Sequence, residues 1–488
     1  MNKTFLRLRF SDIVFIAVLL LALALGGQML SLDSDLGRHL ALGSYMLDER
    51  VIPTRDLFSH TRTGLSRPPY EWLAQILFTY AHRLLGLDGV ILFTSLIIAL
   101  TFTLVYLYAL HRSKSAVVSM AVTFMAVAAS SIHWLPRPHV FTLLLLVVWI
   151  ELLDQLARGE HIKPYLFPLI MLLWANLHGG FIFGIMAWAA YFAGWLLKAW
   201  RGKSGKQTGR KLLTVGIASI LATIITPDLW RNWEAVLNNR SIFILDRTVE
   251  TMRPVLTDIS ILPHTMLLVV TILLFTLNWK SLKANHLFLL SGLGVMSLLM
   301  TRNIPLFAMA AVPILAEMSA VSLSSFKAWT RIEQRFAGFS SAPGPSVWSL
   351  MVALAAIAFF INFNLTNEQS FHRFDPTEFP VEAADYIEAN PQQGKMFNDF
   401  NWGGYLLHRL WPQYDVFIDS QSDFYGEDLL REYDQIISAN GNWQDLLEKH
   451  HVDWVIVPVD SPLADGIESA SNWETSHFDN IAVIGRRK

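Results

Sequence analysis

The first polar stretch of the chain follows an apolar segment and brings acidic, cationic and titratable side chains close together. Asp33 and Asp35 come first, and Arg38 and His39 follow within one helical turn. Asp33, or the serine after it, can cap a helix that we expect to extend to about Leu47. On that helix Asp35, Arg38 and His39 share one face, which offers the groups that acid–base chemistry requires. The plain alternative is that Asp35 stabilises the helix N-terminus and pairs with Arg38.

The spacing of Asp33 and Asp35 also suits a metal ion. Two carboxylates with open coordination positions are suitable ligands for Mg²⁺ or Mn²⁺. The residues alone leave a metal-dependent and a metal-free site open, and we favour the metal-free one.

A second polar motif extends from Arg67 to Trp72 and contains two consecutive prolines. Prolines here fix an extended approach to a helix and hold Arg67 and Glu71 near its start. The helix is amphipathic to about Leu85, and its tyrosine and tryptophan side chains suit a position in the membrane interface.

Further candidates lie beside predicted membrane boundaries. A tight turn with two glycines surrounds His178, and the backbone N–H groups of such a turn can bind an anion. For each arginine, pairing with a neighbouring acid is an equally good interpretation, and a histidine near a membrane span is more often structural. The candidates are Arg137, His139, Asn176, His178 and Arg302.

The composition indicates what kind of chain positions these residues. Of the 488 residues, 53% are hydrophobic and 16% are charged, whereas a soluble globular protein has about 25% charged residues. This deficit excludes an ordinary cytosolic enzyme. The absence of cysteine excludes disulfides, zinc–thiolate sites and thiol nucleophiles.

Eleven apolar segments meet or approach the roughly 17–25 residues that a membrane-spanning helix needs. The fourth and fifth are short, and the fifth has a re-entrant helix as its alternative. The segments are 13–30, 90–110, 116–132, 140–153, 165–177, 180–197, 212–226, 262–278, 286–300, 304–321 and 347–365.

If all eleven segments cross the membrane, every lysine before residue 366 lies on the same side of it. By the positive-inside rule that side is the cytoplasm, so we expect the N-terminus inside and the C-terminal part outside. The outward side has two long loops, 31–89 and 227–261, and loops of this length are usually functional. The first span could alternatively be a cleaved signal peptide, because residues 22–24 form the small-residue pattern of a cleavage site.

The C-terminal part has the opposite charge balance. Residues 366–488 hold 8 Lys and Arg and 22 Asp and Glu, whereas residues 1–365 hold 30 and 18. Its alternating strand-like and helical stretches predict an independent extracytoplasmic α/β domain. We favour a structural or acceptor-docking role for it over a second active site. We expect strands at 395–398, 416–419, 454–459 and 481–485, and helices at 380–390, 404–411, 427–439 and 443–451.

Several short motifs together resemble the GT-C superfamily of integral-membrane glycosyltransferases, close to its protein O-mannosyltransferase-like and aminoarabinose-transferase-like branch and to a bacterial subset. We therefore expect a polytopic α-helical, GT-C-like transmembrane domain over 1–365 and a soluble α/β domain over 366–488. The motifs are Asp33-Ser34-Asp35, Pro53, Arg67-Pro68-Pro69 with Trp72-Leu73, Trp134 to His139, Trp174 to Gly180, Arg302 to Pro305, Trp402 to Leu406 and Phe417 to Ser420.

The resemblance implies transfer of a sugar from a polyprenyl-phosphate carrier to a lipid, polysaccharide or protein acceptor, on the outer face of a bacterial inner membrane and with no nucleic acid involved. Asp35 would be the general base, with Asp33 as its alternate or as a metal ligand. Some members of the superfamily need a divalent cation, Mg²⁺ or Mn²⁺, and others do not. Contacts to the donor phosphate or substrate would come from Arg38, His39, Arg67, Glu71, Arg137, His139, Asn176, His178 and Arg302.

Two other functions fit parts of the pattern. A transporter or flippase of a lipid-linked or anionic substrate would place ionisable groups in the middle of the membrane and often has paired halves. Here the charges gather at outward boundaries and no internal repeat is visible. A scaffold of the same fold that binds the lipid carrier without catalysis is the third interpretation.

Overall fold

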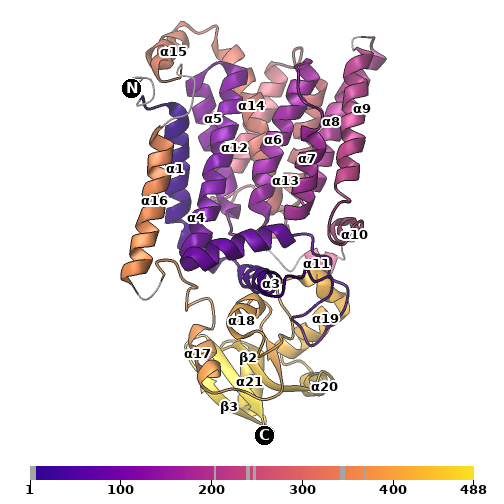
Figure 1. Ribbon diagram of the computed structural model, residues 1–488, viewed down its shortest axis with the longest axis vertical. Coiled ribbons are helices and arrows are strands. Elements are labelled where there is room, and N and C mark those ends of the chain that lie inside the picture. Colours follow the sequence, from indigo (N-terminus) through magenta and orange to yellow (C-terminus); the bar gives the residue numbers. More distant parts are fainter. Residues whose placement is uncertain (1–6, 203–204, 238–241, 246–248, 341–346, 368–369) are drawn as a thin grey trace.

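The computed structural model describes residues 7–202, 205–237, 242–245, 249–340, 347–367 and 370–488. A tall bundle of helices stands above a smaller part that contains a four-stranded sheet (Figure 1). The start of α1 (Phe10–Ala24) and helix α15 (Lys327–Ser340) lie at the end of the bundle opposite the sheet. One end of the bundle therefore meets the sheet-containing part, and the other end meets helix α15.

Each of the eleven predicted spans coincides with helix among the described residues. The first one is broken, because α1 ends at Ala24 and α2 begins at Gly26, where two glycines weaken helix formation. The helices are α1 (Phe10–Ala24), α2 (Gly26–Ser31), α4 (Trp72–Ser113), α5 (Ala116–Ser130), α6 (His139–Arg158), α7 (Leu166–Leu177), α8 (Phe181–Trp200), α9 (Lys206–Ala222), α12 (Leu262–Leu277), α13 (Ala284–Leu299), α14 (Ile304–Leu323) and α16 (Val347–Thr366).

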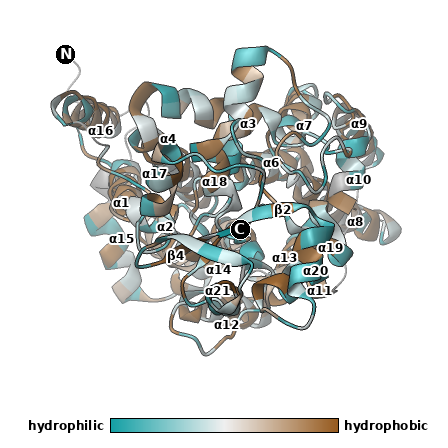
Figure 2. Ribbon diagram, turned by 90° about the horizontal axis from the view of Figure 1, so that it is seen from below, coloured by the Kyte–Doolittle hydropathy of each residue, from teal (hydrophilic) through white to brown (hydrophobic). Residues whose placement is uncertain are grey.

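Among the described residues, six helices are long and apolar enough to cross a membrane, and four shorter apolar helices accompany them. The chain is therefore a multi-pass membrane protein, and the number of eleven crossings stays a prediction. Figure 2 places α16 at the edge of the bundle, where Phe360 is its one buried side chain among the described residues. An apolar helix that is so little covered by protein suits a position facing lipid.

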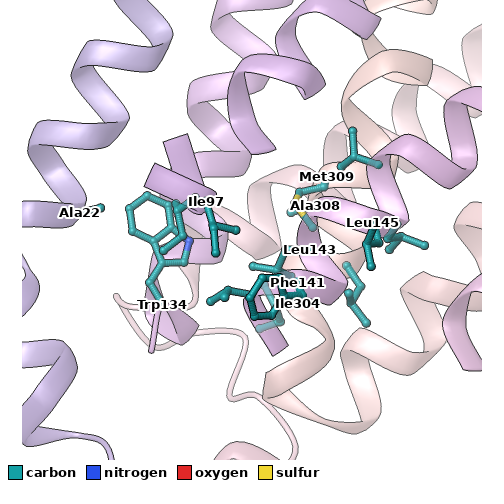
Figure 3. Packing of buried hydrophobic residues seen from close by; sticks show 14 of the residues in the cluster. Ala22, Ile97, Trp134, Phe141, Leu143, Leu145, Ile304, Ala308 and Met309 are labelled. Carbon is teal, nitrogen blue, oxygen red and sulfur yellow. The ribbon is translucent and has the colours of Figure 1, made fainter. Parts of the chain in front are cut away.

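The interior of the bundle is packed with apolar side chains from helices far apart in the sequence. Figure 3 shows Trp134 and Ile97 near Ala22, and Phe141 close to Ile304. All five side chains are at most 8% exposed. This packing fixes the ends of the helices and the turns that connect them.

A buried ion network joins helices at the end opposite the sheet. The carboxylate of Asp154 accepts hydrogen bonds from Arg112 Nη1 at 2.5 Å, Tyr191 Oη at 3.2 Å and His286 Nε2 at 3.3 Å. Arg112 also pairs with Glu317. Arg112, Asp154 and His286 lie in the first or last turns of their helices, and the pairing of these charges with one another ties the helices of the bundle together.

The helix predicted to extend to about Leu47 is α3 (Leu36–Glu49). The predicted amphipathic helix is the first part of α4, which lies across the end of the bundle (Figure 1). It ends at a kink where Leu85 and Gly86 leave helical geometry, and Gly86 has a φ of +61°. Glycine adopts this left-handed conformation without strain, so the chain can turn here from the surface helix into the spanning part of α4.

The C-terminal part folds around a sheet with strand order β1-β2-β4-β3. Strands β1 and β2 are parallel, and β4 is antiparallel to both of its neighbours. The elements are β1 (Lys395–Asn398), β2 (Val452–Pro458), β3 (Trp473–Phe478), β4 (Ala482–Arg487), α17 (Val381–Ala389), α18 (Gly403–Leu410), α19 (Ser422–Ile437), α20 (Trp443–Lys449) and α21 (Pro462–Ser469).

The predicted strand at 416–419 is wrong, and β3 and α21 were not predicted. Val416 does not join the sheet, because its backbone N–H donates to Phe58 O at 2.9 Å and its carbonyl accepts from His60 N at 3.1 Å. A segment of the first outward loop thus takes the backbone hydrogen bonds of this stretch. The polar sequence of β3 suits an edge strand and carries little of the apolar alternation that identifies a strand.

Two glycines allow α18 to approach α3 closely. A Cβ atom on Gly37 would lie 2.2 Å from Gly404 O, and a Cβ atom on Gly404 would lie 2.2 Å from Ser34 O. Both distances are shorter than any real contact of a Cβ atom with backbone. The contact therefore needs glycine on both sides, and it brings the C-terminal part against the loop of Asp33 and Asp35.

We expect Gly404→Ala to lower the thermal stability of the purified protein by about 1–3 kcal/mol, the usual cost of overpacking, and to reduce activity. Gly27→Ala is the matched control, because a Cβ atom on Gly27 meets nothing within 4 Å. Thermal unfolding in detergent, followed by intrinsic fluorescence, compares the two variants. Equal melting temperatures for both would contradict the role of the glycine contact.

Candidate active site

The candidate residues gather where five segments of the bundle face the C-terminal part. They come from the loop between α2 and α3, the start of α4, the turn before α6, the turn between α7 and α8, and the turn before α14. In Figure 1 these turns lie at the end of the bundle nearest the sheet. Segments far apart in the sequence therefore supply one polar site.

Asp33 is buried and holds the loop in place. Its Oδ1 accepts hydrogen bonds from the backbone N–H groups of Asp35 at 2.8 Å and Leu36 at 3.0 Å, and from Arg137 Nε at 2.7 Å. Its Oδ2 is buried and has no hydrogen-bond partner in the described part of the chain. Burial raises the pKa of the Asp33 carboxyl to about 6, against the attraction of Arg137, and the charge of Asp35 adds to the rise.

Asp35 is surrounded by cations. Its carboxylate pairs with Arg38 Nη2 at 3.1 Å and Arg137 Nη1 at 2.9 Å, and it accepts a hydrogen bond from the Ser420 hydroxyl. Burial alone would raise the pKa of Asp35, but the charges of Arg137 and Arg38 hold it well below its ordinary value. A carboxylate stabilised in this way is a weak base.

Arg137 is the cation that joins the acidic groups. Beyond its contacts with Asp33 and Asp35, its Nη1 pairs with Glu250 at 2.9 Å. A divalent cation between the two aspartates would have to occupy the place of this guanidinium, and no cluster of three metal-ligating side chains occurs among the described residues. In this arrangement the guanidinium of Arg137 neutralises the two carboxylates and takes the place of a cation between them.

Arg67 is held entirely by side chains around it. Its Nη1 donates to Asp56 at 2.5 Å, and its Nη2 donates to Asp419 Oδ2 at 3.1 Å and to Gln421 at 2.6 Å. Its guanidinium also stacks on the Phe424 ring, 4.5 Å from the centroid. Arg67 thus joins the Arg-Pro-Pro motif to the C-terminal part rather than standing free for a phosphate.

The C-terminal part contributes residues that the sequence analysis did not place in the site. Asp419 is fully buried and lies 3.9 Å from Arg38 as well as next to Arg67. Ser420 reaches Asp35, and Gln421 Nε2 donates to Tyr70 Oη at 3.4 Å. The sequence signal for this contribution is the run Phe417 to Ser420, which is part of the resemblance although its local pattern predicts the end of a strand.

Glu71 lines the same small cavity as Arg38, and its side chain is 13% exposed. Its Oε1 is 3.7 Å from His178 Nε2. Burial raises the pKa of the Glu71 carboxyl to about 7, against the attraction of Arg38, and Asp35 and Asp423 add to the rise. For His178, burial lowers the pKa to about 3, so its ring is neutral at physiological pH.

Three further predicted site residues, His39, His139 and Asn176, are held by neighbouring protein groups. His39 Nδ1 contacts Gln75 Nε2 at 3.1 Å, and His139 Nε2 contacts the His133 carbonyl at 3.0 Å. The Asn176 side chain accepts from Trp72 Nε1 at 2.8 Å and donates to backbone carbonyls. These three side chains have structural partners.

Arg302 differs from them. Within the described ranges no carboxylate pairs with it and it makes no hydrogen bond, while its charge contributes to the low pKa of His178. Arg302 is therefore a cation at the site whose charge no acid neutralises among the described residues.

Two hollows border these residues. A cavity of about 20 Å³, which is room for one water molecule, is lined by Arg38, Arg67, Tyr70, Glu71 and Gln421 among others. A groove of about 1290 Å³ begins at Ser31 and Leu32, directly before Asp33, and continues between α2, the α4 kink and α18. Its walls combine apolar side chains of the bundle with polar side chains of the C-terminal part.

No protein-family model and no curated protein matches the sequence. Solved structures do match. The oligosaccharyltransferase of Archaeoglobus fulgidus in the apo form has a TM-score of 0.60 at 12% identity, covering 91% of this chain and 70% of that chain. The same enzyme tethered to an acceptor peptide with the NVT sequon has a TM-score of 0.59 at 12% identity, covering 91% and 69%.

The archaeal enzyme in complex with an inhibitory peptide and a dolichol-phosphate has a TM-score of 0.59 at 11% identity, again covering 91% and 69%. Oligosaccharyltransferases of this kind have the GT-C fold. Identities this low establish the fold alone. The expected architecture, a GT-C-type membrane bundle with a small C-terminal sheet, is therefore confirmed.

Proposed function

With the GT-C fold as the premise, we propose that the protein is a glycosyltransferase that moves a sugar from a polyprenyl-phosphate carrier to an acceptor outside the cytoplasm. The observation that carries the proposal is the convergence of Asp35, Arg38, Glu71, Arg137 and Arg302 at one end of the bundle. Acidic groups can handle the acceptor proton, and guanidinium groups can stabilise the departing phosphate.

The carrier phosphate would meet Arg302 and the outer edge of Arg137. Arg302 has no acidic partner in the described ranges, and Arg137 Nη2 has no hydrogen-bond partner there, although its other nitrogens are engaged. Paired and planar N–H groups of this kind match phosphate oxygens. The phosphate leaves with an extra negative charge, so these groups bind the leaving group more tightly as the glycosidic bond breaks.

The carrier is amphipathic, and the surroundings of the site suit such a molecule. The groove beside Ser31 and Leu32 has apolar walls towards the bundle and polar walls towards the C-terminal part. One similar structure is a complex with a dolichol-phosphate, which supports a lipid-linked donor here. The acceptor is a lipid, a polysaccharide or a protein; the tethered acceptor peptide of another similar structure makes a protein acceptor a specific candidate.

We place the site on the outer face of a bacterial inner membrane, with the N-terminus in the cytoplasm. The start of α1 and the basic helix α15 lie at the end of the bundle opposite the site (Figure 1), which supports this orientation by the positive-inside rule. The transmembrane part would comprise residues 1–365 and the extracytoplasmic part residues 366–488. No divalent cation enters the proposed reaction, because Arg137 fills the place between Asp33 and Asp35.

The test compares surface glycans and glycolipids by mass spectrometry in a deletion strain restored with wild-type protein or with Asp35→Asn. We expect the glycan to return only with wild type, and its mass difference to identify the sugar. Asp35→Asn removes the charge that holds Arg38 and Arg137 together, so we expect transfer to fall by at least about 10²-fold.

The matched control is Asp258→Asn, which changes an exposed aspartate of the second outward loop. It should restore the glycan fully. If wild type and Asp35→Asn restore the glycan equally, Asp35 has no role in transfer. If the glycans are the same with and without the protein, the proposed activity is wrong.

A further inference from the structure

Glu71 has an unusual position among the acidic groups of the site. Its carboxylate makes no hydrogen bond to any other described residue and lines the small cavity next to Arg38 and Tyr70. Asp33 Oδ1 and Asp35, by contrast, are engaged by Arg137 and by backbone or hydroxyl groups. Asp33 Oδ2 has no partner among the described residues, but it is buried and closed to an incoming molecule. Glu71 is thus the acidic group of this cluster whose oxygens are available to an incoming molecule.

His178 is the one side chain of the described residues that pairs with this carboxylate, and it can act in one way. His178 Nδ1 accepts a hydrogen bond from the backbone N–H of Gly180 at 3.0 Å, so Nδ1 carries the lone pair. The Thr142 hydroxyl, 2.8 Å from the same nitrogen, accepts from Trp174 Nε1 at 2.8 Å and is left to donate to Nδ1. The ring proton therefore sits on Nε2, the nitrogen that faces Glu71 Oε1.

A neutral imidazole fixed in this tautomer can donate to Glu71 but cannot take a proton from a substrate. In many active sites a buried carboxylate orients a catalytic histidine by hydrogen bonding. Here the arrangement is the reverse, because the histidine orients the carboxylate and the carboxylate acts as the base. The separation of 3.7 Å is longer than a hydrogen bond, and such contacts commonly tighten when substrate binds. His178 is accordingly a positioning residue for Glu71.

Resting on the proposed function, we infer that Glu71, rather than Asp35, is the general base that takes the proton from the acceptor hydroxyl. In the step, the acceptor oxygen forms a bond to the anomeric carbon of the sugar. The bond between that carbon and the carrier phosphate oxygen breaks, and its electron pair stays with the phosphate. The hydroxyl proton passes to a Glu71 carboxylate oxygen, so charge and atoms balance.

The electrostatic surroundings of Glu71 agree with this role. Arg38 attracts the ionised form, while Asp35 on the α2–α3 loop and Asp423 on α19 repel it; Arg137 also attracts it. His178 from the α7–α8 turn is neutral, and Tyr70 is beside it with a pKa raised well above its ordinary value by burial. A base with a pKa near 7 combines an ionised fraction with proton affinity at physiological pH.

The experiment measures transfer in right-side-out membrane vesicles, which hold the cell's own lipid-linked sugar, while the outer pH varies between about 5 and 8.5. In wild type the rate should rise with pH through about 7, because the base must be deprotonated. Glu71→Gln should lower the maximal rate by about 10²–10⁴-fold, abolish the rise near pH 7 and leave the apparent KM for donor unchanged.

Several controls separate the outcomes. Glu49→Gln, an exposed glutamate at the end of α3, should behave as wild type. Asp33 has a pKa of about 6, so a rise that persists in Glu71→Gln would assign the titration to Asp33 or another group and overturn the inference. Retained maximal rate in Glu71→Gln would do the same while leaving the proposed function intact.

Wild type gives a test that does not depend on any variant folding. If its vesicles transfer sugar at a rate that is constant between about pH 5 and 8.5, Glu71 is not the base. If they transfer none, whereas vesicles of another strain with the same glycan do, the proposed function itself fails. Glu71→Asp, which moves the carboxylate by one methylene, should recover part of the rate and the rise with pH.

Discussion

Arg137→Met is expected to abolish transfer and to destabilise the protein together. The guanidinium of Arg137 separates Asp33 from Asp35 and also pairs with Glu250. Without it, three carboxylates face one another in a buried site. Removing one partner of a buried ion pair costs about 3–5 kcal/mol, and removing a donor that stabilises developing negative charge costs about 10²–10³-fold in rate. Thermal unfolding and the glycan assay measure the two effects.

Arg137→Lys and a double variant sharpen this prediction. Lysine keeps the charge but not the forked contact with Asp33 and Asp35, so we expect stability to be partly retained and transfer still to fall strongly. Adding Asp33→Asn to Arg137→Met removes one uncompensated charge, and the double variant should be more stable than Arg137→Met alone. A double variant that is less stable would show that Arg137 does not act by neutralising Asp33.

Much of this architecture follows from composition and periodicity. Apolar segments of sufficient length and the sorting of lysine predict which turns share one end of the bundle. The turns with Arg137, His178 and Arg302 therefore belong with Asp35 on sequence evidence alone. The helical spacing of Asp35 and Arg38 also predicts the contact that the structure contains.

The chemical assignment of the acidic residues could not be predicted in the same way. A sequence shows that Asp35 is acidic, but not that Arg38, Arg137 and Ser420 saturate its oxygens. Nor does it show that the carboxylate of Glu71 is mostly covered and makes no hydrogen bond among the described residues, with His178 Nε2 3.7 Å away. The availability of a carboxylate depends on partners up to hundreds of residues away, which periodicity does not encode.

The C-terminal part also shows what local sequence patterns can and cannot predict. The local pattern predicts the strand β1 and the helix α18 well, because a short buried run and helix spacing are local properties. Val416 was assigned to a strand for the same reason, yet its backbone partners are Phe58 and His60 from the first outward loop. A short extended segment can pair with any suitable backbone, so its partner is decided by the tertiary fold.

That pairing is what carries Asp419 into the site, and substituting this residue tests whether the C-terminal part belongs to the catalytic machinery. Asp419→Asn leaves Arg67 with one carboxylate partner, Asp56, and withdraws a negative charge from Arg38. Breaking this buried pair should cost about 3–5 kcal/mol of stability.

We expect Asp419→Asn also to lower transfer by at least about 10²-fold. The substitution should shift Ser420 and Gln421, and their hydrogen bonds to Asp35 and Tyr70 would then be lost. A small misplacement of groups in an active site can reduce the rate by this factor. Asp428→Asn, an exposed aspartate on α19, is the matched control and should leave both quantities unchanged. A double-mutant cycle with Arg67→Gln isolates the pair, since the two substitutions should be strongly non-additive. If the effects on stability are additive and Asp419→Asn transfers sugar normally, the C-terminal part is a separate docking domain. If the effects are non-additive and transfer falls, the C-terminal part forms one side of the active site.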